Sequence, residues 1–406
     1  MPRIKLMVKP DNTFLNLLLY EGLLTLIQYS GTDVRININE IELPHDALRR
    51  VLKAVRDSED ARKELDFVKI GFVGNDLRHK IGAAILFKTG IPISKSISIK
   101  NYASVLKYLV DNADRIFDLM DDELLFNIIS GNLVIGRKKA ISAPQLFKID
   151  RYTGFTSLDA NTTYKQYGVR ASIQWIIIGI LGIMSSYVTQ AGAKREFSHH
   201  FLFLSPDEIA GMVGSRDPVY IFNIMMLKKK LIHRLREILK RPIPEELLLL
   251  KILLDTGLIA ELKRLDIDHI AFQLYRIVVE GQTYKIYNTV PIILYSMPYY
   301  LDLLNRIARD GEKLVESLRK ALDTKSPIIR AIYSFHIDNK YPEADHMVSA
   351  IHELYRLIAL GDPSGLYGFM RELETASKTL EESREEDSRN RARQYRRIIK
   401  EISYHI

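Results

Sequence analysis

The 406-residue sequence contains no cysteine. This absence excludes disulfide bonds, zinc sites with thiolate ligands and cysteine nucleophiles. It is typical of proteins in a reducing compartment, or of proteins that work at high temperature, where thiols are a liability. The N-terminal segment has no apolar stretch behind its first basic residues, so no cleavable secretory signal is visible. We therefore expect a cytoplasmic protein.

The sequence also lacks the standard signatures of nucleotide-binding and hydrolytic enzymes. It has no GxxxxGK[ST] phosphate loop, no HExxH zinc motif and no GxSxG nucleophile motif. The spacing of Gly71, Gly74 and Gly82 is weak evidence for a phosphate loop, and a turn after a strand explains these glycines better. We assign no cofactor, no metal and no catalytic residue.

Adjacent histidine and aspartate residues leave a metal-dependent nuclease as an alternative. Such an enzyme needs several ligands that converge on one ion, because each side chain supplies only one or two of about four to six bonds. A helix start after Pro44 explains one of these pairs as capping. The candidate ligands are His45, Asp46, His199, His200, Asp268 and His269.

One long uncharged segment raises the question of membrane insertion. Residues 171–193 carry no charge, but their strongly apolar part runs only from Trp175 to Met184. A membrane-spanning helix needs about 20 mainly apolar residues. We interpret the segment as a buried core helix in which Gly179 and Gly182 admit a neighbouring element, and we expect no membrane partner. A membrane-associated protein stays open as an alternative.

Two kinds of periodicity predict an α+β fold. Residues 34–43 alternate like a strand, whereas residues 45–58 place apolar side chains at helical spacing. Residues 271–290 form two runs rich in β-branched and aromatic side chains, a pattern typical of a β-hairpin. Beyond Pro298 the signal is almost wholly helical. We therefore expect a mixed main domain at 1–297 that includes the hairpin, and a C-terminal helical bundle at 298–406.

Positive charge is concentrated in one region of the chain. Residues 130–241 contain 17 Lys and Arg against 7 Asp and Glu, an excess of ten, while the whole chain has a net charge of +8. The remaining residues are therefore slightly acidic. Basic surfaces bind polyanions without sequence preference because binding releases counterions from the phosphates. We therefore expect residues 130–241 to bind nucleic acid.

Four groups of residues are candidates for this binding. A helix expected at 227–241 carries a basic stripe. Residues 131–142 predict a strand, a turn after Gly136 and a second strand. Residues 151–170 interleave aromatic with basic side chains, as proteins that bind single strands do. A fourth group lies on the glycine-flanked loop 74–82. Solvated surfaces and core aromatics are the alternative explanations. The candidates are Lys229, Arg236 and Lys240 on the helix, Arg137, Lys138 and Lys139 in the turn, Arg151, Lys165 and Arg170 in the aromatic segment, and Asn75, Arg78 and Lys80 on the loop.

The segment 381–400 switches from acidic to basic. Glu385 with Arg389 and Asp387 with Arg391 are spaced as i,i+4 ion pairs in the favourable order, which supports an exposed helix. Its basic end is only partly balanced in this way, so it is a candidate surface for a partner. The residues of that basic stripe are Arg389, Arg393, Arg396 and Lys400.

The later part of the chain resembles a known family. The segments are DRYTGFTSLD (150–159), YKQYGVRASIQW (164–175) with the apolar helix after it, and the hairpin YRIVVEGQTYKIYNTVPI (275–292) ahead of a helical C-terminus. Their layout resembles that of the large subunit of archaeal type I-A CRISPR interference complexes (Cascade), over about the last 250 residues. No site residue is carried over from the family.

This resemblance implies a function and a set of partners. The expected protein is a non-enzymatic subunit of a crRNA-guided surveillance complex in antiviral defence. It reads the protospacer-adjacent motif, helps to open target DNA and presents the complex to a helicase-nuclease. The implied partners are crRNA, target DNA, the other CRISPR complex subunits and that helicase-nuclease. Base pairing then supplies most of the sequence information, and the protein needs a small duplex-reading surface and basic grooves.

Overall fold

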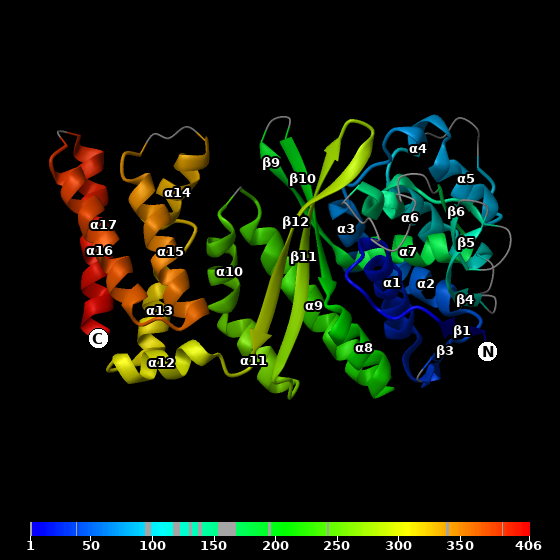
Figure 1. The fold of residues 1–406 in the computed structure, drawn as a ribbon, viewed down its shortest axis with the longest axis horizontal. Coiled ribbons are helices and arrows are strands. Elements are labelled where there is room, and N and C mark those ends of the chain that lie inside the picture. The colour runs from blue at the N-terminus through cyan, green and yellow to red at the C-terminus, as the bar shows by residue number, and fades with distance from the viewer. Residues whose placement is uncertain are drawn as a thin grey trace. The chain divides into compact units, whose positions relative to one another are not determined.

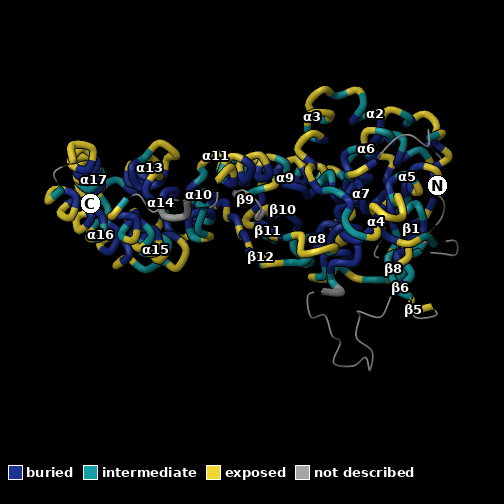
Figure 2. Tube along the Cα trace, turned by 90° about the horizontal axis from the view of Figure 1, so that it is seen from above, coloured by how far each residue is buried: buried dark blue, intermediate teal, exposed yellow. Residues whose placement is uncertain are grey.

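The protein is described here by a computed structural model (Figure 1). The structure describes residues 2–37, 39–93, 99–116, 122–129, 132–136, 140–152, 168–193, 196–241, 243–337, 341–383 and 385–406. The expected α+β class is confirmed, since helices and strands both form cores. Buried residues, dark blue in Figure 2, run through both parts of the chain. Unit 1 comprises Met1–His233 and Ala271–Ile292, and unit 2 comprises Arg234–Ile270 and Ile293–Ile406.

The division into units differs from the boundary expected near residue 298, because the last part of unit 2 begins at Ile293 and unit 2 also includes residues 234–270. The sequence reading assigned residues 234–270 to the main domain, whereas they group with the C-terminal helices. The reason is tertiary packing: α10 (Glu245–Leu253) lies against α15 (Ala344–Leu360), and Leu247 and Leu250 join the core of unit 2. A change of period along the chain cannot show which distant helix a segment will contact.

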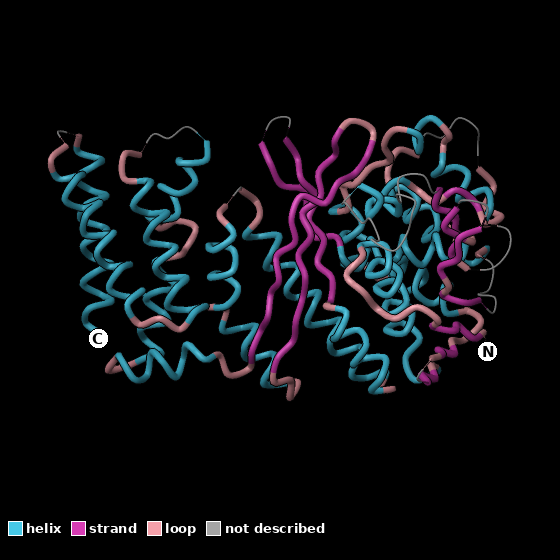
Figure 3. Tube along the Cα trace, viewed as in Figure 1, coloured by secondary structure: helices cyan, strands magenta, loops and turns pink. Residues whose placement is uncertain are grey.

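The described residues form three four-stranded sheets (Figure 3). The first has the order β2 (Arg35–Asn37), β3 (Glu40–Glu42), β1 (Arg3–Leu6) and β4 (Asp122–Leu124). The second has the order β5 (Phe126–Ile129), β6 (Asn132–Ile135), β8 (Gly168–Ala171) and β7 (Ile141–Ser142). The third has the order β12 (Thr283–Tyr295), β11 (His269–Glu280), β10 (Glu196–Leu204) and β9 (Tyr187–Ala193).

The strand predictions hold with two differences in pairing. The alternating segment 34–43 folds back on itself as the antiparallel strands β2 and β3, so it is not one strand. The strands β6 and β7 form as expected on either side of Gly136, but they flank β8 instead of pairing with each other. The hairpin β11–β12 turns at Gly281, whose φ of 61° is left-handed and suits glycine.

The helices of unit 1 surround a central pair. Helices α1 (Phe14–Ser30) and α7 (Ile173–Ser186) pack closely because Gly182 of α7 lies against the backbone of Leu18, where a Cβ atom would clash. Of the uncharged residues 171–193, Ile173–Ser186 therefore form a core helix as expected, whereas Tyr187–Ala193 form strand β9. None of the described helices is long and apolar enough to span a membrane. The other helices of this part are α2 (Ala47–Asp57), α3 (Glu59–Phe67), α4 (Asn75–Arg78), α5 (Ile81–Lys88), α6 (Tyr102–Asp111), α8 (Pro206–Ser215) and α9 (Pro218–Ile238).

A buried ion pair joins four elements of unit 1. Glu21 of α1 and Lys228 of α9 are 0% and 1% exposed, and their charged atoms lie 2.5 Å apart. The second carboxylate contact comes from the backbone N–H of Leu204 in β10, which donates to Glu21 Oε1 at 3.0 Å. The Ser185 hydroxyl of α7 donates to Oε2 at 3.2 Å. Burial lowers the pKa of Lys228, and the neighbouring carboxylate opposes this shift.

Unit 2 is predominantly helical. Its buried residues form one continuous hydrophobic cluster, to which Leu354, Phe369 and Tyr395 belong. Helix α15 packs against its neighbours on both sides, and the last two helices lie together (Figure 1). The remaining helices are α11 (Thr256–Arg264), α12 (Tyr299–Ile307), α13 (Gly311–Ala321), α14 (Pro327–Ile337), α16 (Ser364–Glu381) and α17 (Glu386–His405).

We predict that Lys228→Met strongly destabilises the protein. Removing one partner leaves the Glu21 carboxylate buried without a cation, a change that costs about 3 to 5 kcal/mol. The double variant Glu21→Gln with Lys228→Met should recover much of this loss, because an amide keeps an acceptor for Leu204 N–H without a charge. Urea denaturation measures both. The matched control is Lys63→Met, whose exposed pair with Glu59 contributes about 1 kcal/mol or less. Equal midpoints for Lys228→Met and the control would contradict the prediction.

Candidate nucleic-acid interface

The predicted binding residues do not gather at one place among the described residues. Arg137, Lys138, Lys139 and Lys165 lie outside the described residues, as does the side chain of Arg151. Arg170 is exposed on β8, and its Nη2 donates to the backbone carbonyl of Ala140 at 2.8 Å. Predictions for the first five residues therefore stay predictions.

Several members of the basic stripe expected on α9 are buried or paired in the structure. Arg236 is buried, and Lys229 is half-buried. Lys240 Nζ lies 2.6 Å from Glu237, and His233 Nε2 lies 3.5 Å from Glu64. Counting acids close in sequence missed Glu64, which the fold brings to α9 from α3. This helix is therefore a weaker candidate than its sequence indicated.

The loop candidates Asn75, Arg78 and Lys80 are all exposed, and they lie on a larger surface formed by α4 and α5. Positions 84, 87 and 88 share one face of α5, since they are spaced by three and four residues, and Lys80 directly precedes this helix. Two apolar side chains are exposed here, Leu77 at 49% and Phe87 at 73%. We call this the α4–α5 surface; its residues are Asn75, Leu77, Arg78, His79, Lys80, Phe87 and Lys88.

The cations of the α4–α5 surface lack acidic partners. Within the part of the chain that the structure describes, Arg78, Lys80 and Lys88 form no ion pair. Residues 67–100 contain 6 Lys and Arg but only one acid, Asp76, which is buried. This segment is more unbalanced for its length than residues 130–241. A shorter counting window would have found the signal in the sequence.

Contacts with the hairpin hold the loop that carries this surface. Gly74 has a φ of 50°, and a Cβ atom there would lie 2.6 Å from the backbone oxygen of Gln282. The Tyr284 hydroxyl of β12 donates to the backbone oxygen of Gly71. Lys80 adopts the left-handed conformation between α4 and α5, which turns the chain sharply. The hairpin thus positions the exposed residues that follow these anchors.

Asp76 anchors α4 from the inside. Its carboxylate is buried and accepts a hydrogen bond from the backbone N–H of Gln145 at 2.7 Å. Burial raises the pKa of Asp76 to about 6, although the hydrogen bond from Gln145 and the charge of Lys148 oppose the shift. The buried hydroxyl groups of Tyr102 and Tyr284 lie near enough for Asp76 to raise their pKa as well, after burial itself. Asp76 is therefore a structural residue, while its neighbours face solvent.

The residues of the metal-nuclease alternative do not form a ligand set in the described ranges. No group of three or more His, Asp and Glu is arranged there to hold a metal ion. His199 and His200 are adjacent on β10, so their side chains project to opposite faces of the sheet. Burial lowers the pKa of each to about 4, and His199 Nδ1 lies 3.0 Å from the Tyr187 hydroxyl. Asp46 pairs with Arg50 Nε at 2.9 Å.

Comparisons with known proteins identify one relative along the whole chain. A protein of Archaeoglobus fulgidus, described as an uncharacterized protein, is 35% identical over 411 positions, and the alignment covers 100% of both chains. No protein-family model matches the chain, and no solved structure matches it. The two proteins are therefore homologous along their full length.

We predict that Asp76→Asn stabilises the protein above pH 6. A carboxyl group whose pKa is raised from 3.8 to about 6 by folding favours the folded state at low pH. That contribution is lost as the pH rises between these values, so the charged Asp76 destabilises the fold at pH 7 by on the order of 2 to 3 kcal/mol. Asparagine keeps an acceptor for Gln145 N–H and carries no charge.

Urea denaturation of both proteins at several pH values measures the effect. The advantage of Asp76→Asn should be small near pH 4, grow to pH 6 and stay constant above it. A difference between the two proteins that does not depend on pH would contradict the assigned burial of a charge. The control is Asp66→Asn, because Asp66 is exposed and its pKa is lowered by the hydrogen bond from Lys107.

Proposed function

This chain belongs to the same family as the Archaeoglobus fulgidus protein, and we propose that it binds nucleic acid through the α4–α5 surface. The observation that carries this proposal is the combination of unpaired cations with exposed apolar side chains on a loop anchored from within. Arg78, Lys80 and Lys88 supply positive charge, and Phe87 offers a stacking platform between them. Proteins hold single strands by this combination of phosphate contacts and base stacking.

The exposure of Phe87 adds to the argument from charge. Cations on a surface are common and cost little, so an unpaired lysine alone indicates nothing specific. A phenylalanine that is 73% exposed contributes little to the core, and Leu77 beside α5 is also half exposed. The polar amide of Asn75 and the cations around it are the groups that read base edges or bind phosphates. We therefore favour nucleic acid over a small anion as the ligand of this surface.

We further propose that the protein is the large subunit of a crRNA-guided type I-A CRISPR complex, without catalytic activity of its own. The support is the resemblance in layout: an apolar helix (α7), a long hairpin (β11–β12) and helices in the C-terminal part follow one another in that order. In this role the protein reads the protospacer-adjacent motif, helps to open target DNA and contacts crRNA, other subunits and a helicase-nuclease. A cytoplasmic location is part of the same proposal.

We predict that neutralising the α4–α5 surface weakens nucleic-acid binding in a salt-dependent manner. In the double variant Arg78→Gln with Lys88→Gln, each lost phosphate contact should reduce the slope of log K against log salt by about 0.7 to 0.9. Phe87→Ala should weaken binding of a single strand by about 1 to 3 kcal/mol and leave the salt slope nearly unchanged. Fluorescence anisotropy with labelled oligonucleotides measures both quantities.

The matched control for these variants is Lys63→Gln, an exposed lysine of unit 1 that already pairs with Glu59. It should bind as the parent protein does. If the double variant and Phe87→Ala both bind with the parent affinity and slope, the α4–α5 surface is a solvated face and the proposed site is wrong.

We predict that Asn75 reads base edges in an assembled complex. Purification from the native host, followed by RNA sequencing and mass spectrometry, should recover crRNA and the other subunits with the chain. Target binding is then compared for several flanking motifs with Asn75→Ala and, for the predicted turn, Arg137→Ala. A base contact should cost about 1 to 3 kcal/mol on the preferred motif only, whereas a phosphate contact weakens all motifs alike. Recovery without RNA or CRISPR subunits would argue against the assignment.

A further inference from the structure

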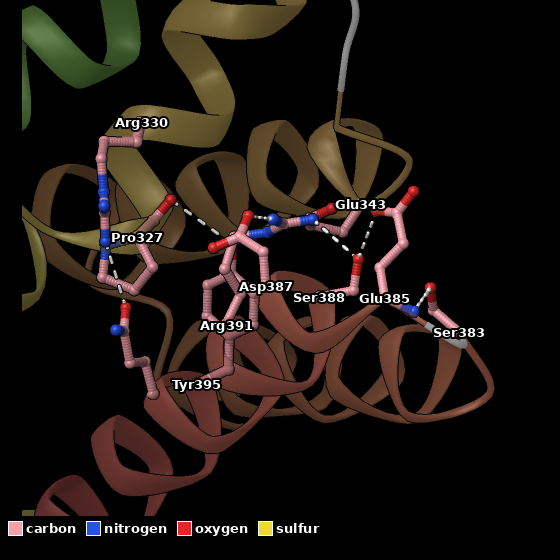
Figure 4. Close-up of polar contacts among 10 residues, drawn as sticks. Pro327, Arg330, Glu343, Ser383, Glu385, Asp387, Ser388, Arg391 and Tyr395 are labelled. Carbon is pink, nitrogen blue, oxygen red and sulfur yellow. Dashed lines mark hydrogen bonds and ion pairs between the residues drawn. The ribbon is translucent and has the colours of Figure 1, made fainter.

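A buried polar network fixes the orientation of α17 within unit 2 (Figure 4). Arg391 Nε donates to Glu343 Oε1 at 2.7 Å, and Arg391 Nη1 pairs with Asp387. The guanidinium also lies over the ring of Tyr341, 4.4 Å from its centroid. The Tyr395 hydroxyl lies 3.3 Å from the same Glu343 oxygen. Because Arg391 and Tyr395 are buried on one side of α17, the helix cannot rotate about its axis without breaking these contacts.

The opposite side of α17 is exposed and cationic. Five basic residues fall at positions separated by four, seven, eight and eleven residues from the first, which places them on one face of the helix. All five are exposed. We call them the α17 cationic face; they are Arg389, Arg393, Arg396, Arg397 and Lys400.

Most basic residues of the α17 cationic face have no acidic partner, whereas other basic residues of unit 2 do. Arg396 pairs with Glu381 at 2.5 Å, and the other four members form no ion pair with any acid that the structure describes. By contrast, several exposed lysines of the same unit have partners: Lys313 with Asp310 at 2.9 Å, Lys320 with Glu316 at 3.1 Å and Lys378 with Glu374 at 2.9 Å.

We propose that the α17 cationic face is a second phosphate-binding surface, which holds the backbone of a nucleic acid without reading its sequence. Four of its five members are arginines, whose planar guanidinium groups bind phosphate oxygens in a bidentate manner. From Arg389 to Lys400 the helix rises by about 16 Å, the axial length of about five phosphates of one duplex strand. The buried network fixes the helix before binding, so only the exposed side chains have to be ordered.

The α17 cationic face and the α4–α5 surface share no residue, and the inference rests on the proposed function only in taking nucleic acid as the ligand. The two surfaces differ in one respect that predicts different behaviour. The α4–α5 surface includes an exposed phenylalanine and an exposed asparagine, whereas the α17 cationic face consists of charged groups alone. Its contribution to affinity should therefore be the same for all base sequences.

The test is the triple variant Arg393→Gln, Arg397→Gln and Lys400→Gln in the full-length protein. The probes are labelled oligonucleotides of mixed sequence, as a single strand and as a duplex, titrated at several salt concentrations. With about 0.7 to 0.9 lost per phosphate contact, the slope of log K against log salt should fall by about 2 or more. The control is the triple variant Lys313→Gln, Lys320→Gln and Lys378→Gln, which removes the same charge from paired positions and should retain the parent slope.

Comparing this variant with Arg78→Gln and Lys88→Gln separates the two proposals. A loss confined to the α17 variant supports the present inference and rejects the α4–α5 surface as the site. An unchanged slope and affinity in the α17 variant overturns the inference, whether or not the α4–α5 variant loses binding. Thermal unfolding of each variant tests whether the fold is retained. We expect it to be retained, because none of the substituted α17 residues is buried.

Discussion

The arrangement of unit 1 depends on the buried carboxylate of Glu21. It accepts hydrogen bonds from β10 and α7 and pairs with Lys228 of α9, so one buried side chain of α1 contacts three other elements. Such a pair stabilises a fold little compared with apolar residues of the same size, but it tolerates few alternative arrangements. The pair also contacts the core helix α7, because the Ser185 hydroxyl donates to Glu21 Oε2.

The same pair shows what a net charge counted over residues 130–241 leaves out, while nucleic-acid binding by this region stays a prediction. Lys228 and Arg236 are counted there as free cations, yet both are buried, and His233 meets Glu64 from a distant helix. A window of the sequence records charges but not their partners, which the fold brings from elsewhere. The shorter segment 67–100 keeps its imbalance in the structure, because its only acid, Asp76, points inward.

Local periodicity predicted the secondary structure better than it predicted pairing. Helix α2, the core helix α7 and the hairpin at Gly281 follow from apolar spacing and turn residues that lie within a few positions of each other. The placement of β8 between β6 and β7 and the packing of α10 on α15 depend on contacts between distant segments, which no local pattern encodes. Asp150, the first residue of the segment 150–159, also makes contacts that no local pattern predicts. It accepts hydrogen bonds from the N–H groups of Phe14 and Leu15 at 2.9 and 3.0 Å, and so caps a helix 135 residues away.

Both cationic surfaces combine exposed basic residues with one buried ionisable residue. In each, one ionisable residue of the local sequence turns inward and is buried, Asp76 in α4 and Arg391 in α17, while its neighbours face solvent. Exposed cations cost little in water and are screened by salt, so a lack of ion pairs is weak evidence by itself. It becomes stronger where a buried anchor fixes the side from which the cations project. When the helix is already fixed, only the arginine side chains have to be ordered as phosphates bind, whereas on a freely turning helix the backbone would have to be ordered as well.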